Sequence, residues 1–169
     1  MFNAEIFIMK KTVAFIIFTF LLLSNNSFAD LTYAPDINLP GIDGNVQLKN
    51  LKGKVVYLDF WASWCLPCKK SFPWMNEMKD RYSSQGFEIL AVNLDKDRTL
   101  ADEFLKEMPA NFLVAFDASG DSASTYKLKG MPGSYMIGRN GMLHASHIGF
   151  REKDKDKLEQ LIKDMLDKK

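Results

Sequence analysis

Both cysteines of this 169-residue chain, Cys65 and Cys68, lie close together where a strand-like run changes into a helix-like run. Residues 55–60 are almost continuously apolar, which is typical of a strand covered on both faces. Residues 69–82 carry apolar side chains at near-helical spacing. A disulfide here would close a loop of two residues, so its chain-entropy contribution to stability would be minor. The pair is therefore interpreted as chemically active, with a structural disulfide as the alternative.

The strand-to-helix junction predicts unequal roles for the two sulfur atoms. Unpaired backbone N–H groups and the helix dipole favour negative charge at a helix N-terminus. The pKa of Cys65 is therefore predicted to lie below the value of about 8.5 for a free cysteine. Cys68 falls one turn later and is expected to be more buried. We expect Cys65 to attack a partner's disulfide and Cys68 to resolve the mixed disulfide. Pro67 suits the first turn of a helix.

The residues around the pair argue against a metal or haem site. Zinc needs about four ligands, and the only other soft candidates are His144 and His147. Three positions apart on a predicted strand, they are expected to point to opposite faces. Haem attachment requires a histidine directly after the second cysteine, and Lys69 stands there. The sequence thus predicts no metal and no cofactor.

The rest of the chain predicts an α/β layered fold with a mixed central sheet flanked by helices. Asp59 interrupts the first long strand and is expected to be buried. Val46 and Leu48 are expected on the returning strand of an N-terminal hairpin. Asn140-Gly141 predicts a hairpin between the last two strands. The further strands and helices are expected at residues 87–92, 100–107, 112–116, 122–128, 134–137, 142–148 and 152–168.

The N-terminus has the pattern of a secretory signal peptide. Lys10 and Lys11 precede an uncharged run, residues 12–23, and Ser27 and Ala29 form a small-x-small site. The apolar run is shorter than the roughly 20 residues of a spanning helix. We predict cleavage after Ala29, with an uncleaved anchor as the alternative.

Residues 1–29 are therefore predicted to be a signal peptide and residues 30–169 one domain, located in the periplasm without stable membrane insertion. The formal net charge is +1 and no basic block occurs. This pattern gives no support to nucleic acid or a charged membrane surface as a partner.

Residues 60–69, which contain the cysteine pair, resemble the active-site signature of thioredoxin-fold proteins, in particular the exported TlpA/ResA-like thiol-disulfide oxidoreductases. Residues 34–39 resemble the N-terminal segment of that group. The strand-helix unit at about residues 87–107 is similar to its insertion, and residues 130–137 to its cis-proline loop. The resemblance covers essentially the whole predicted mature domain.

This resemblance implies roles for several residues. Pro132 would be cis and lie against the disulfide, which would leave the backbone of Met131 free to pair with an extended substrate strand. The alternative is an ordinary loop proline. Asp59 matches the buried thioredoxin aspartate and would help to move the Cys68 proton, with a pKa raised by desolvation. Its alternative role is only to bridge neighbouring groups.

The residues next to the cysteines are expected to bind substrate. Trp64 would form part of an apolar docking rim, together with Leu66, Pro67 and Met131. The Leu66-Pro67 pair and Met131 are also expected to tune the redox potential. Trp61 is expected to pack beneath the site.

Ser71 departs from the family pattern, because many TlpA/ResA-like proteins carry Glu three residues after the second cysteine. Pro73, two positions later, is kept. That glutamate is associated with the members that act in cytochrome maturation. Its absence weakens assignment to that pathway and leaves the general thiol chemistry intact.

The sequence therefore predicts a periplasmic, monomeric thiol-disulfide oxidoreductase that reduces protein disulfides and receives electrons from a membrane protein. One alternative is a peroxidase of the peroxiredoxin type. Another is a non-enzymatic holdase or binding module with an apolar face around Trp64, Met131 and Tyr135.

Overall fold

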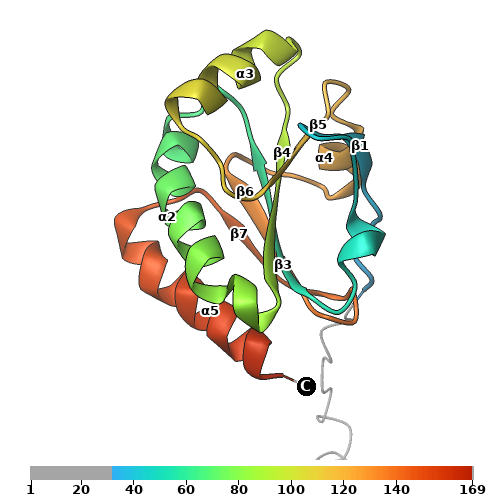
Figure 1. The fold of residues 1–169 in the computed structure, drawn as a ribbon, viewed down its shortest axis with the longest axis vertical. Helices are drawn as coiled ribbons and strands as arrows, with labels where there is room; N and C mark the ends of the chain where they lie inside the picture. Colours follow the sequence, from blue (N-terminus) through green and yellow to red (C-terminus); the bar gives the residue numbers. More distant parts are fainter. Residues whose placement is uncertain (1–31, 169) are drawn as a thin grey trace, which may run out of the picture. The chain divides into compact units, whose positions relative to one another are not determined.

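The computed structural model describes residues 32–168, and the predicted signal peptide lies outside them. A five-stranded mixed sheet forms the centre, in the order β5-β4-β3-β6-β7 (Figure 1). Its strands are β3 (Val55–Trp61), β4 (Phe87–Asn93), β5 (Leu113–Phe116), β6 (Gly133–Ile137) and β7 (Leu143–Ile148). A two-stranded sheet, β1 (Asn38–Pro40) with β2 (Asn45–Gln47), precedes them.

The sheet topology follows from the lengths of the connections. β3, β4 and β5 are parallel and are joined through the helices α2 and α3, because a parallel pair needs a long crossover. β6 pairs with β3 antiparallel, and β7 pairs with β6 antiparallel. The hairpin predicted at Asn140-Gly141 is therefore confirmed. The helices are α2 (Leu66–Tyr82), α3 (Arg98–Glu107), α4 (Asp121–Thr125) and α5 (Lys155–Asp167), with 3-10 turns η1 (Leu48–Leu51), η2 (Ser83–Gln85) and η3 (Glu152–Asp154).

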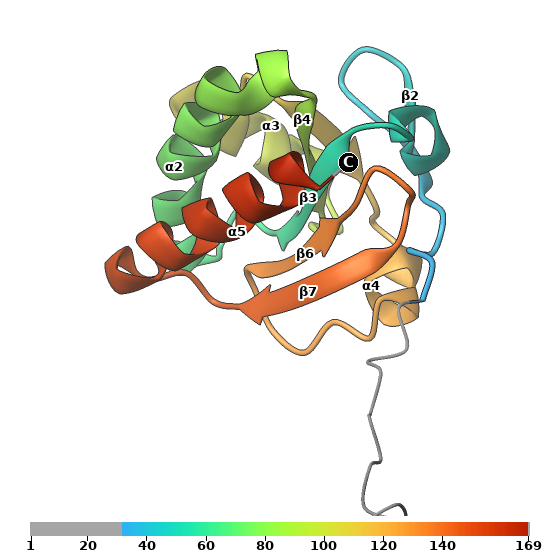
Figure 2. The same cartoon turned by 90° about the horizontal axis from the view of Figure 1, so that it is seen from below.

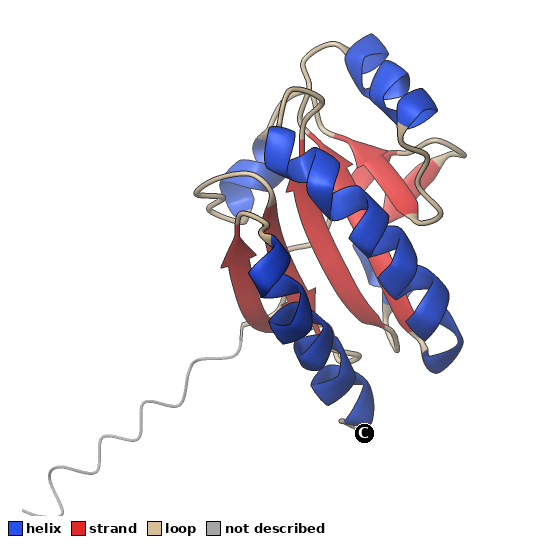
Figure 3. Ribbon diagram, turned by 90° about the vertical axis from the view of Figure 1, so that its left-hand side faces the viewer, coloured by secondary structure: helices blue, strands red, loops and turns tan. Residues whose placement is uncertain are grey.

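Alternation along β3 divides the core into two layers. Every residue of β3 is buried, as its continuous apolar run predicts. Tyr57 and Trp61 face the layer that contains residues of α2, α3 and α5. Leu58 and Phe60 face the layer formed with η1 and α4. Figures 1 and 3 show α2 and α5 running across one face of the sheet, and Figure 1 places α4 and β1 on the other side.

The predicted order of elements is confirmed, and two local predictions are wrong. Leu48 begins η1 instead of extending the returning strand. His144 and His147 do not point to opposite faces, because a β-bulge between Met136 and Ile137 interrupts the pairing with β7. His144 lines a pocket with Met165 of α5, and His147 lines another with Leu158 and Leu161 of α5. An extra residue in one strand shifts the alternation by one position.

No helix within residues 32–168 is long and apolar enough to cross a bilayer.

Candidate active site

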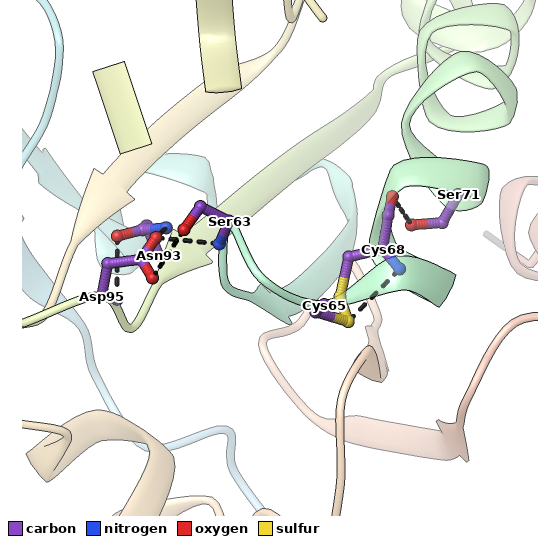
Figure 4. Close-up of a disulfide and its surroundings, with 6 residues drawn as sticks. All are labelled: Ser63, Cys65, Cys68, Ser71, Asn93 and Asp95. Atoms are coloured by element: carbon purple, nitrogen blue, oxygen red, sulfur yellow. Dashed lines mark hydrogen bonds between the residues drawn. A yellow bond between two sulfur atoms is a disulfide. The ribbon is translucent and has the colours of Figure 1, made fainter. Parts of the chain in front are cut away.

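The cysteine pair lies at the start of α2, where the strand-to-helix junction predicts it (Figure 4). Cys65 is the N-cap residue of the helix, and its Sγ accepts a hydrogen bond of 3.3 Å from the backbone N–H of Cys68. The two sulfur atoms form a disulfide, with an S–S distance of 2.02 Å. The first sulfur is thus held where helix N–H groups stabilise a thiolate once the disulfide is reduced.

The two cysteines differ in their access to the surface. Cys68 is completely buried, whereas Cys65, with 4% of its surface exposed, lines an open surface pocket of about 520 Å³. Trp64 and Leu66 flank this pocket with 69% and 72% of their surface exposed. The other lining residues are Pro67, Leu128, Gly130 and Met131. All four residues predicted to bind substrate therefore lie on one surface with the accessible sulfur. The sequence predicts neither Leu128 nor Gly130 as a lining residue, because Leu128 precedes the cis-proline loop without a motif of its own and Gly130, the first residue of that loop, has no side chain to suggest a role.

Met131 presents a free backbone beside this pocket. Within the described residues, neither its N–H nor its C=O has a hydrogen-bond partner. The Met131–Pro132 peptide bond is cis, the isomer that the resemblance implies. Pro132 itself is buried. Unpaired backbone groups next to an apolar pocket are the arrangement by which an extended chain adds to a sheet edge.

Asp59 is an isolated buried carboxyl group in the centre of the sheet. It is completely buried, and neither of its oxygen atoms has a hydrogen-bond partner among the described residues. Desolvation raises the pKa of Asp59 well above its usual range. By strand alternation its side chain faces the same layer as Tyr57, Trp61 and the helix that carries Cys68. Burial without a partner favours the protonated form of this carboxyl group, so it is suited to accept a proton from a neighbouring thiol.

Ser71 is buried against the site, and its hydroxyl donates to the backbone C=O of Cys68 at 3.0 Å (Figure 4). The position therefore faces inward, and a glutamate there would bring a second carboxyl group into the buried region. In this chain a serine hydroxyl, already bonded to the helix backbone, takes its place. The acidic side chain in this layer is therefore Asp59, which belongs to the sheet, and α2 adds none at position 71.

A second buried carboxylate supports the loop before the cysteines, and sequence reasoning missed it. Asp95 accepts hydrogen bonds from the backbone N–H and the hydroxyl of Ser63, at 2.9 and 3.0 Å. The side-chain amide of Asn93 donates to the same carboxylate at 2.8 Å (Figure 4). Asn93 is the last residue of β4, and Asp95 follows two positions later. The one available signal was the polar Asn-x-Asp pattern at the carboxyl end of a parallel strand, where sites often form.

The aromatic residues near the site have different functions. Trp61 packs beneath it, with ring centroids 4.9 Å from Phe72 and 4.6 Å from Phe104, as predicted. Tyr135 does not line the surface pocket next to Cys65, which we call the docking pocket. Its hydroxyl donates to the backbone C=O of Tyr126 at 2.8 Å, so the apolar face predicted around Trp64, Met131 and Tyr135 is wrong in its third member.

Among residues 32–168, no cluster of three or more histidine, cysteine or acidic side chains is arranged to hold a metal ion.

Comparison with known proteins agrees with this geometry. The Redoxin family model matches residues 30–162. The thiol-disulfide oxidoreductase ResA of Bacillus thuringiensis subsp. konkukian is 35% identical over 131 residues, which is 77% of this chain and 75% of the relative. The crystal structure of a candidate thiol:disulfide interchange protein DsbE from Chlorobium tepidum is 51% identical, with a TM-score of 0.80, and the match covers 80% of this chain and 96% of that protein.

A lipoprotein thioredoxin, Etrx1 of Streptococcus pneumoniae, is 31% identical with a TM-score of 0.68, over 77% of this chain and 99% of that one. The mixed sheet, the Cys65–Cys68 pair at the helix N-terminus and these similarities lead to one assignment. The chain belongs to the Redoxin family and is a TlpA/ResA-like thiol-disulfide oxidoreductase that acts on protein thiols and disulfides.

Proposed function

We propose that this oxidoreductase is exported to the periplasm and there reduces disulfides of client proteins. The observation that carries the disulfide exchange is the position of Cys65, because a sulfur at a helix N-cap is a stabilised thiolate once reduced and lines the surface pocket next to Trp64 and Met131. Export is supported by the basic residues Lys10 and Lys11, the short apolar run after them, and Ala29 at the cleavage site.

In the proposed reaction the Cys65 thiolate attacks a client disulfide, forms a mixed disulfide and releases one client thiolate. The sulfur of Cys68 then attacks Sγ of Cys65. The Cys68 S–H bond breaks and its proton passes to the carboxylate of Asp59. The Cys65–Cys68 bond forms as the second client sulfur leaves with the electron pair of the broken bond. The client is reduced by two electrons, and the enzyme is oxidised to the disulfide.

The client is bound as an extended strand in this proposal. The backbone of Met131 would pair with it, while Trp64, Leu66 and Pro67 contact its side chains. The disulfide must then be reduced again. Because the periplasm is kept oxidising, we assign that step to a membrane protein that donates electrons. We assign a monomeric state, since helices cover both faces of the central sheet.

Two variants test the reaction. Cys65→Ala is expected to abolish reduction of insulin in a precipitation assay, and retained activity would contradict the proposal. Cys68→Ser is expected to accumulate mixed disulfides on Cys65 in cells, which can be isolated and identified. Thiol labelling of cells that carry the wild-type protein is expected to find the Cys65–Cys68 pair reduced. Sequencing the N-terminus of the periplasmic protein is expected to begin at Asp30.

A further inference from the structure

Three residues on adjacent strands form a polar row across the sheet. Asp59 of β3 pairs with Ser134 of β6, and Ser134 pairs with His147 of β7. Residues opposite each other in antiparallel strands place their side chains on the same face, with Cβ atoms about 4.5–5.5 Å apart. On its other side, Asp59 pairs with Ala91 of β4. Of the two cross-strand neighbours of Asp59, Ser134 is the polar one. It lies on the side of Asp59 nearer to β7, which is the edge strand of the sheet (Figure 2).

The end of this row reaches solvent. The side chain of His147 is 24% exposed, yet its Nε2 atom is buried and has no hydrogen-bond partner among the described residues. The imidazole ring therefore extends from the interior to the surface. Its Nε2 lies 3.6 Å from Oδ2 of Asp154, a carboxylate that also accepts two hydrogen bonds from Arg151. A carboxylate at this distance can stabilise a transient imidazolium.

A small cavity lies beside two members of the row, Ser134 and His147. It measures about 10 Å³ and is lined by Tyr57, Ser134 and His147, among others. A cavity of roughly 10–15 Å³ holds one water molecule when two or more polar groups surround it. The hydroxyl groups of Tyr57 and Ser134 and the imidazole meet that condition. Leu158 and Leu161 of α5 close the other side and offer no competing charge.

The buried carboxyl group of Asp59 needs a path by which its proton can reach solvent. If Asp59 accepts the proton of Cys68 in each turnover, it must release that proton before the next one. Both of its oxygen atoms are buried without a partner, so direct release to bulk water is blocked. We propose that Ser134 and His147 form a proton route that links Asp59 to solvent at the edge of the sheet. The proposal rests on the function proposed above for Asp59.

The proton balance of the route is simple. Asp59 receives the proton from Cys68 as the Cys65–Cys68 bond forms. Once a hydrogen bond forms between Asp59 and its cross-strand neighbour Ser134, the carboxyl group passes a proton to the Ser134 hydroxyl, which passes one of its own through the cavity to Nε2 of His147. The opposite nitrogen of the ring releases a proton to water, and the same route runs in reverse when the disulfide is reduced. No electrons move along it.

The charged and titratable groups around the route are few. Tyr57 flanks Asp59 on β3, and burial raises its pKa. Cys68 of α2 lies in the same buried layer as Tyr57. Asp154 and Arg151 flank His147 from the turn before α5.

The test measures resolution of a mixed disulfide in single turnover, at several pH values and low buffer concentration. His147→Ala is expected to slow this step about tenfold, within the range of general acid-base effects, and added imidazole is expected to restore the rate. Ser134→Ala is expected to slow it similarly without rescue by imidazole, whereas Ser134→Thr keeps the hydroxyl and the rate.

The chain supplies a matched control on the same strand. His144→Ala is expected to leave the rate unchanged, because His144 lies in a separate pocket. Asp59→Asn separates the two proposals. A wild-type rate in Asp59→Asn overturns the proposed function of Asp59 itself. Two outcomes overturn the route alone. In the first, Asp59→Asn resolves the mixed disulfide slowly while His147→Ala resolves it at the wild-type rate. In the second, His147→Ala is slow and added imidazole does not restore its rate.

Discussion

Ser63 and Asp95 are joined by two hydrogen bonds, from the backbone N–H of Ser63 at 2.9 Å and from its hydroxyl at 3.0 Å. This contact connects the loop two residues before Cys65 with the end of β4. It fixes the loop from the side opposite to α2. The accessible sulfur is therefore positioned by a helix N-terminus and by a buried carboxylate that lies 32 residues away in sequence.

Breaking this contact is expected to disturb catalysis as well as stability. Asp95→Ala leaves the half-buried N–H of Ser63 and the buried amide of Asn93 without their acceptor, which costs about 2–3 kcal/mol of unfolding free energy. We expect the second-order rate constant for insulin reduction to fall about tenfold, since misplacing a reacting group by a small distance has a large effect. Denaturant unfolding and insulin reduction measure the two effects.

Asp97 provides the matched control. It caps α3 by accepting from the backbone N–H of Thr99 at 2.9 Å and is exposed. Asp97→Ala is expected to cost about 1 kcal/mol as a lost N-cap and to leave the rate unchanged. An equal loss of rate in both variants would show that Asp95 acts only through stability.

Trp64 is expected to contribute to binding of protein clients and little to the exchange step. Trp64→Ala should raise KM for insulin about tenfold, the size of a binding hot spot, with little change in kcat. The rate with a small disulfide such as oxidised glutathione should be almost unchanged, because such a substrate does not need the rim. Ile42→Ala is the control, since Ile42 is exposed in the β1–β2 turn and does not line the pocket.

Asp59 is expected to make the oxidised protein less stable as the pH rises. An aspartate in an unfolded chain ionises near pH ~3.9, whereas desolvation raises the pKa of Asp59 well above that value in the folded protein. Between the two pKa values the folded state binds one more proton, so its stability falls as the pH increases. Asp59→Asn removes this penalty and should gain on the order of 1–3 kcal/mol at pH 7.5.

The same variant should match the wild type near pH 3.5, where Asp59 is mostly protonated in both states. Urea unfolding of the oxidised proteins at the two pH values measures the difference. Asp97→Asn should behave in the opposite way, because a hydrogen bond from Thr99 lowers the pKa of Asp97. A gain for Asp59→Asn that is equal at both pH values would contradict the assignment to ionisation.

Glu159 is expected to stabilise the packing of α5 on α2 above about pH 4.5. Its Oε1 accepts from the hydroxyl of Tyr82 at 2.5 Å and from Arg81 at 2.6 Å. Favourable contacts lower the pKa of Glu159 to about 2, and among them the hydrogen bond from Tyr82 has the largest effect. Glu159→Gln should therefore cost about 2 kcal/mol at pH 7, and the difference should disappear as the pH falls toward 2.

Glu77 is the control for this effect, because it pairs with the same Arg81 from within α2. Both partners of that pair are substantially exposed, so Glu77→Gln should change the unfolding free energy by less than about 0.5 kcal/mol. Thermal unfolding as a function of pH distinguishes the two variants.

The sequence alone determined the local elements and the reactive pair. Residues 55–60 predict a buried strand because their apolar run is continuous, and the helical spacing after Cys68 predicts α2. Together they place Cys65 at a helix N-terminus. The burial of Asp59 also followed from its position inside that run. These features depend on neighbours in sequence, so periodicity and composition suffice to predict them.

Only the tertiary structure decided which distant side chains meet. A period of two along each strand does not specify register, so the row of Asp59, Ser134 and His147 became visible only once β3, β6 and β7 were paired. The bulge that places His144 on the α5 side depends on one extra residue in β7, for which the sequence offers no local signal. The contact between Ser63 and Asp95 likewise arises because β3 and β4 end at the same edge of the sheet.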